Sequence, residues 1–269
     1  MSKPKSPNDY APPTFVSQQQ TPSNGLRYGE MVSYVFENPD WFTNVLLGGV
    51  CFLIPVVGPI VLLGYRYEVI DHWNTHSQAT YPNFDFNKFG EYLSRGIWPF
   101  LVLLVGGLMI VPLILLCYFA SFLVFMLAAS LGPEFAIVGV IVSFIVLFGG
   151  IILSAAVSGL VLVPLELKAG MQRDFAAGFD IKFISKFIGL TWKEILIGFL
   201  FLYVVNLALS LVGMLILCVG IYFTMAISMM AQTHLEHQLY LLYLQRGGTP
   251  VPTPTSTTSQ TPQRPTSGW

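Results

Sequence analysis

The chain alternates long apolar runs with short polar segments. Four stretches contain no Asp, Glu, Lys or Arg, namely residues 41–65, 96–133, 135–165 and 195–233, with lengths of 25, 38, 31 and 39 residues. Uncharged apolar runs longer than about 18 residues are typical of transmembrane helices. The pattern therefore predicts an all-α, polytopic transmembrane helical bundle, and it excludes a water-soluble fold.

Turn residues divide these runs into individual spans. Residues 97–128 and 135–165 predict two spans joined by the short turn SLGPEF. The first is too long for the hydrocarbon core unless it tilts, protrudes or kinks at Pro112. The last run predicts a hairpin around VGMLILCVG, with helices near 193–212 and 219–243 and with Gly213 and Gly220 as turn residues.

The first run, WFTNVLLGGVCFLIPVVGPIVLLGY, is interrupted by Pro55, Gly58 and Pro59. It fits either one kinked span or two short helices that meet at PVVGP. Of the 13 Lys and Arg residues, 3 precede residue 41, 3 lie in 65–96, 5 lie in 166–193 and 2 lie in the tail. All of them face one side only if the chain enters and leaves the membrane within 41–65. The positive-inside rule therefore favours about six membrane segments, the first pair short, with both termini cytoplasmic.

Composition supports this picture and limits the partners. Charged residues make up 10% of the chain, hydrophobic residues 54%, and the formal net charge is -1. This balance excludes a basic nucleic-acid binder, so we expect no nucleic-acid partner. We expect a disordered cytoplasmic tail at 1–26, one integral membrane domain at 27–246, and a disordered Thr/Pro/Ser-rich tail at 247–269.

Small residues recur along one face of the 135–165 span. This seam lets another helix approach closely, and it leaves open whether that helix belongs to the same chain or to a second subunit of a homo-oligomer. Its members are Gly139, Ser143, Gly150, Ser154 and Ser158.

Residues 181–193, IKFISKFIGLTWK, form an amphipathic pattern. An interfacial helix there would place Lys182, Lys186 and Lys193 among anionic lipid headgroups. The alternative is a cytoplasmic helix that packs on the bundle.

The sequence offers few candidates for chemistry. It contains no nucleophile elbow, phosphate-binding glycine loop, HExxH or CxxC motif, so we expect neither an enzyme nor a cofactor. The four histidines form two pairs, His72 with His76 and His234 with His237. If the pairs converge they could supply a four-nitrogen metal site, whereas interfacial histidines explain them more simply. Glu166 is expected to be a surface group that pairs with Lys168 or Arg173.

Several segments together resemble an uncharacterised family of prokaryotic multi-pass membrane proteins, domain of unknown function 4013. These segments are NPDWFTNVLLGG, LIPVVGPIVLLGYRYEVI, YPNFDFNKFGEYLSRG, AAGFDIKFISKFI and LILCVGIYFTMAISMMA, and the resemblance covers about residues 29–245. The family's Leu-Pro-Glu before the Phe-Asp loop is replaced here by Tyr81-Pro82-Asn83. The resemblance implies a bacterial or archaeal plasma membrane, and it implies no activity.

Two functional hypotheses follow. The first is a non-enzymatic membrane scaffold or accessory protein that contacts lipid or partner proteins, because catalytic motifs and charges within the spans are missing from the sequence. The alternative is a transporter or channel for a neutral or lipidic substrate, with the broken PVVGP segment as a half-helix site.

Overall fold

The chain folds into helices, as the computed structural model of residues 25–75, 80–215 and 220–253 shows. Every regular element in these ranges is helical, which confirms the predicted all-α bundle. The elements in order are α1 (Tyr28–Ser33), η2 (Tyr34–Phe36), α2 (Trp41–Phe52), α3 (Val57–Thr75), η3 (Phe86–Lys88), α4 (Phe89–Ser130), α5 (Pro133–Gln172), α6 (Phe175–Gly178), α7 (Ile181–Leu215) and α8 (Gly220–Gln245).

Three helices in the described ranges are long and apolar enough to cross a membrane. They are α4 (together with η3), α5 and α7, while α2 is a shorter apolar helix. These helices indicate a membrane protein. The finer expectation of about six segments, with α2 and α3 as a short first pair, stays a prediction.

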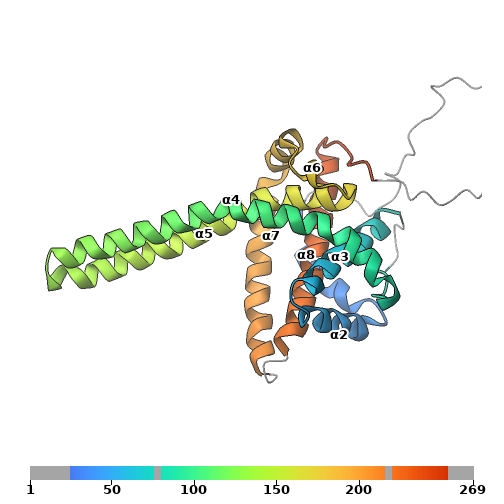
Figure 1. The fold of residues 1–269 in the computed structure, drawn as a ribbon, viewed down its shortest axis with the longest axis horizontal. Coiled ribbons are helices and arrows are strands. Elements are labelled where there is room, and N and C mark those ends of the chain that lie inside the picture. The colour runs from blue at the N-terminus through green and yellow to red at the C-terminus, as the bar shows by residue number, and fades with distance from the viewer. Residues whose placement is uncertain (1–24, 76–79, 216–219, 254–269) are drawn as a thin grey trace, which may run out of the picture.

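Two hairpins dominate the shape of the molecule. Helices α4 and α5 run side by side as a long hairpin that extends far from the other helices, and α7 and α8 leave the centre in a different direction (Figure 1). Helix α4 has 42 residues and continues through Pro99 and Pro112, so it is about 63 Å long. Helix α4 therefore does not end at Pro112, and its tilt, protrusion or kink relative to a membrane stays a prediction.

A glycine and a proline make the turn between α4 and α5. Gly132 has a φ of 124°, which lies in the region that only glycine adopts easily, and Pro133 begins α5. The Gly132 carbonyl accepts hydrogen bonds from the amides of Phe135 and Ala136. The short turn predicted from SLGPEF therefore forms at these residues.

Helices α3 and α4 cross with their backbones in contact. A Cβ atom on Gly64 would lie 1.9 Å from the Tyr92 carbonyl oxygen, and one on Gly96 would lie 1.8 Å from the Ile60 carbonyl oxygen. Real Cβ atoms never approach that closely, so both positions require glycine. This contact fixes the start of α4 against α3.

The two ends of the described chain meet in one core. Leu26 and Val251 belong to the same buried hydrophobic cluster. The Arg27 amide also donates to Gln238 Oε1 over 2.8 Å. The two ends of the described chain therefore lie close together.

Candidate functional site

Three helices meet at a buried cluster of charged side chains. Arg66 on α3 donates from Nη1 to Glu166 Oε1 on α5 over 2.9 Å, and its Nη2 lies 2.5 Å from Glu236 Oε2 on α8. The exposed fractions of the three residues are 4%, 2% and 0%. One guanidinium thus sits between two carboxylates, out of contact with solvent. We call these three residues the ion cluster.

Neighbouring polar groups orient the ion cluster. Arg66 Nε donates to Thr233 Oγ1 over 3.2 Å, and Gln232 Nε2 donates to Glu236 Oε1 over 3.0 Å. Nε and Nη1 of the guanidinium therefore have hydrogen-bond acceptors, whereas Nη2 and Glu236 Oε2 are close enough for an ion pair but do not form a hydrogen bond. Charge-assisted contacts of this kind are stronger than neutral hydrogen bonds, and burial raises the penalty for breaking one of them.

A tyrosine and a glycine hold α5 against α3 beside the cluster. The Tyr67 hydroxyl donates to the Glu166 carbonyl oxygen over 2.7 Å. A Cβ atom on Gly170 would lie 2.0 Å from Tyr67 Cζ, so the ring occupies the space that a side chain there would need. Glu166 and Gly170 are four residues apart and share one helix face. The sequence LELKAG therefore places a carboxylate and the space for the Tyr67 ring on the same face of α5, toward α3.

The surface role expected for Glu166 is wrong. The residue is buried and pairs with Arg66, which is 100 residues away in sequence. Lys168, one of its two expected partners, instead pairs with Asp180 over 2.5 Å. That contact lowers the pKa of the Asp180 carboxyl below its usual range. Helical geometry explains the error, because Lys168 lies two positions from Glu166 and points to a different face of α5.

Two of the predicted metal ligands lie next to the ion cluster but bind other partners. The His234 ring stacks on Tyr34, with ring centroids 4.6 Å apart, and its Nδ1 accepts from Gln238 Nε2 over 2.9 Å. His237 Nε2 lies 3.3 Å from Asn74 Oδ1. One ring nitrogen of each histidine therefore contacts a side-chain amide group, that of Gln238 for His234 and that of Asn74 for His237.

The predicted four-histidine site is not assembled by the part of the chain that is described. No group of three or more His, Cys, Asp or Glu there could hold a metal ion. His72 is at the end of α3, and His76 lies outside the described residues.

The small-residue seam of α5 faces α4 of the same chain. A Cβ atom on Gly139 would lie 2.3 Å from Ala128 Cβ, and one on Gly150 would lie 2.4 Å from Cys117 Cβ. The neighbour left open by the sequence is therefore α4.

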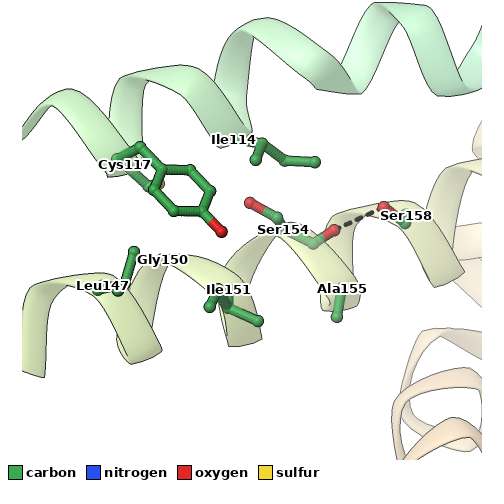
Figure 2. A pocket seen from close by; sticks show the side chains of 9 residues that line it. Ile114, Cys117, Leu147, Gly150, Ile151, Ser154, Ala155 and Ser158 are labelled. Carbon is green, nitrogen blue, oxygen red and sulfur yellow. Dashed lines mark hydrogen bonds between the residues drawn. The ribbon is translucent and has the colours of Figure 1, made fainter. Parts of the chain in front are cut away.

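The serines of the seam bond mostly to backbone. The Ser143 carbonyl accepts from Ser121 Oγ over 2.8 Å, and Ser158 Oγ donates to the Ser154 carbonyl over 2.7 Å. The Ser154 hydroxyl is buried without a hydrogen-bond partner among the described residues and points into the space between α4 and α5 (Figure 2).

A groove of about 370 Å³ runs over this part of the hairpin. Ser154 and Ser158 supply polar atoms to it, and most of the other lining residues are apolar (Figure 2). Its lining is Ile114, Cys117, Tyr118, Leu147, Gly150, Ile151, Ser154, Ala155 and Ser158. Such a lining suits a hydrocarbon chain better than a polar solute.

The amphipathic segment 181–193 is the first part of α7 and packs on protein. Phe183 and Phe187 are buried, and their ring centroids lie 5.4 and 5.1 Å from that of Tyr243 on α8. This arrangement fits the packed-helix alternative. Residues 181–193 are continuous with the rest of α7 and do not form a separate helix. The predicted headgroup residues Lys182, Lys186 and Lys193 are nevertheless exposed.

A strained turn separates α2 from α3. Helix α2 ends at Phe52 and α3 begins at Val57, so Pro55 lies in the break while Gly58 and Pro59 lie in the first turn of α3. Val56 has a φ of 65°, an uncommon conformation for a β-branched residue. Pro55 and Val56 are exposed, so the turn lies on the surface of the protein.

Comparisons with known proteins identify a family. The family described as "Protein of unknown function (DUF4013)" matches residues 47–218, which include α3, α4, α5 and α7 and two members of the ion cluster. No curated protein and no solved structure matches the chain. The match covers more than half of the chain and includes LIPVVGPIVLLGYRYEVI, YPNFDFNKFGEYLSRG and AAGFDIKFISKFI in full, although it is shorter than the resemblance over about residues 29–245. The chain therefore belongs to the DUF4013 family.

Proposed function

We propose that this protein is a non-enzymatic membrane scaffold or accessory protein whose α4–α5 hairpin contacts lipid or a partner protein within the bilayer. The observation that carries the proposal is the apolar outer surface of the hairpin beyond the other helices, which we call the arm (residues 104–153). Leu108 on α4 is 62% exposed and Ile152 on α5 is 69% exposed. Surfaces of this kind mark lipid or protein contacts.

The dimensions of the hairpin support a membrane position for the arm. Glu166 follows Gly132 by 34 residues, or about 51 Å of helix. The hydrocarbon core is about 30 Å thick. With the Gly132 turn at one membrane surface, the ion cluster lies beyond the opposite surface, among the polar segments of the chain.

The charge distribution supports an orientation with both termini cytoplasmic, in the plasma membrane of a prokaryote. All 13 Lys and Arg residues fall outside the α4–α5 and α7–α8 turns. The shared core of Leu26 and Val251 is consistent with both tails on one side. The exposed Lys182, Lys186 and Lys193 are available there to anionic headgroups.

The alternative is a transporter or channel for a neutral or lipidic substrate. The observation that favours a lipidic substrate is the groove on the arm, with the hydroxyl of Ser154 directed into it. The PVVGP segment gives this alternative less support, because Pro55 and Val56 lie exposed at the surface.

Two measurements on the full chain separate the proposals, one in native membranes and one after purification into liposomes. A benzophenone amino acid at Ile152 should cross-link to lipid or to one protein in native membranes, whereas the same group at the buried Val163 should give no intermolecular product. Flux of neutral solutes, and flipping of labelled lipids, should match those of empty liposomes. Transport above the empty-liposome control would overturn the scaffold proposal and favour the alternative.

A further inference from the structure

We propose that the ion cluster is a proton-binding site that holds one proton on its two carboxyl groups at neutral pH. The argument starts from a count of charges. Arg66 brings one positive charge, and Glu166 and Glu236 bring two negative charges when both are ionised. An unbalanced charge in the interior is costly, and two carboxylates that share one site do not both ionise easily.

Neighbouring cations are engaged elsewhere. Arg95 on α4 pairs with Asp71 over 2.5 Å, with its guanidinium carbon 6.0 Å from the centre of the Tyr67 ring. Lys168 on α5 pairs with Asp180, and Arg27 pairs with Glu30 over 2.9 Å. Each of these pairs is balanced, so none of them compensates the second carboxylate of the cluster.

The orientation of Gln238 shows that His234 does not supply the missing charge. Gln238 Oε1 accepts from the Arg27 amide over 2.8 Å, and Nε2 lies 3.3 Å from the Arg27 carbonyl oxygen. These two contacts fix which end of the side-chain amide donates. Nε2 therefore donates to His234 Nδ1, which must be unprotonated, and the ring is neutral. His237 is the other histidine beside the cluster.

Within the cluster, the contacts favour Glu166 as the proton carrier. Glu236 accepts a hydrogen bond from Gln232 at Oε1, and its Oε2 forms a close ion pair, without a hydrogen bond, with Arg66 Nη2; both contacts stabilise its ionised form. Glu166 receives Arg66 at Oε1. Loss of the proton from Glu166 to water would leave a net negative charge between α3, α5 and α8. Proton binding would therefore strengthen the contact that holds the base of α5 against the other two helices.

Infrared difference spectroscopy of the purified full chain tests the proposal. At pH 7 the wild-type protein should show the C=O band of a protonated carboxyl group, and Glu166→Gln should remove it. Glu134→Gln, an exposed position in the first turn of α5, should leave the band unchanged. His237→Gln should also leave it unchanged, which separates the carboxyl site from a charged histidine.

Isotope labelling of the wild-type protein gives a test that does not depend on whether the variants fold. With glutamate labelled by ¹³C at the side-chain carboxyl, the same band should shift in the unmodified chain. Loss of the band in Glu166→Gln or Glu236→Gln supports the site. A wild-type spectrum without a protonated carboxyl band at pH 7, or a band that survives both variants, would overturn the proposal.

Discussion

Arg66 Nη1 donates a buried hydrogen bond of 2.9 Å to Glu166 Oε1, and this contact joins α3 to α5 across 100 residues of sequence. Because Glu236 approaches the same guanidinium, this one side chain connects three helices. The long α4–α5 hairpin therefore has a fixed base even though its distal part makes few contacts with the rest of the protein (Figure 1).

Replacing Arg66 should destabilise the protein strongly. Arg66→Met leaves the two carboxyl groups of the cluster, one of them ionised, buried without their cation. Breaking a buried pair in this way costs about 3–5 kcal/mol. Thermal unfolding in detergent, followed by circular dichroism, measures the loss. Lys88→Met is the matched control, because Lys88 is 45% exposed in its pair with Glu68 and should cost less than about 1 kcal/mol. Equal effects of the two variants would contradict the role given to the cluster.

Glycine should be essential at the crossing of α3 and α4. Gly96→Ala forces a Cβ atom to within 1.8 Å of the Ile60 carbonyl, a backbone atom that cannot rotate away. We expect a loss of about 3 kcal/mol, at the upper end of overpacking effects. Gly107→Ala on the same helix meets nothing within 4 Å and should stabilise α4 by up to about 1 kcal/mol. Unfolding midpoints that shift in the same direction for both variants would contradict the close crossing.

The strain at Val56 should be relieved by glycine. A left-handed conformation costs a residue with a side chain about 1–2 kcal/mol, part of which glycine repays in chain entropy. Val56→Gly should therefore raise the free energy of unfolding by up to about 1 kcal/mol. Val57→Gly removes an exposed valine from the first position of α3 and should lower it. A stability gain at Val57, or a loss at Val56, would show that the turn has another conformation.

Asp180 should make stability depend on pH at the acidic end. Its pKa is lowered by Lys168, so the pair stabilises the fold above about pH 4, the usual Asp pKa, and is lost as the pH falls through the lowered value. Asp180→Asn removes the pair and should cost stability at pH 7, with a difference from wild type that shrinks below pH 4. A wild-type difference that stays constant with pH would contradict the pairing.

The sequence predicts the helices well because uncharged runs are a strong signal. The long helices α4, α5, α7 and α8 form near the predicted ranges, and the turn at Gly132 falls within SLGPEF. The predicted ends were less accurate. Helix α7 begins at Ile181, where the Asp180 carboxylate accepts from the amides of Lys182 and Phe183. Its first turns pack on protein through Phe183 and Phe187 against Tyr243, and periodicity alone does not distinguish a protein neighbour from a lipid surface.

The ion cluster could not be assembled from sequence because its members are far apart in the chain. Arg66 ends one uncharged run and Glu166 ends another, so each resembles a residue at the edge of a span. Glu236 lies between two histidines, and this pattern predicts metal binding instead of a buried ion pair. A useful signal was present in LELKAG, where a glycine four residues after a glutamate leaves room for a neighbouring ring.

The measurement that tests the membrane position of the arm most directly is a spin-label accessibility scan in lipid bilayers. Labels at Leu108, Leu115, Ile145 and Ile152, all exposed on the arm, should be accessible to molecular oxygen and shielded from a water-soluble nickel complex. A label at the exposed Lys182 should show the reverse. Arm positions as accessible to the nickel complex as Lys182 would contradict a lipid-embedded arm.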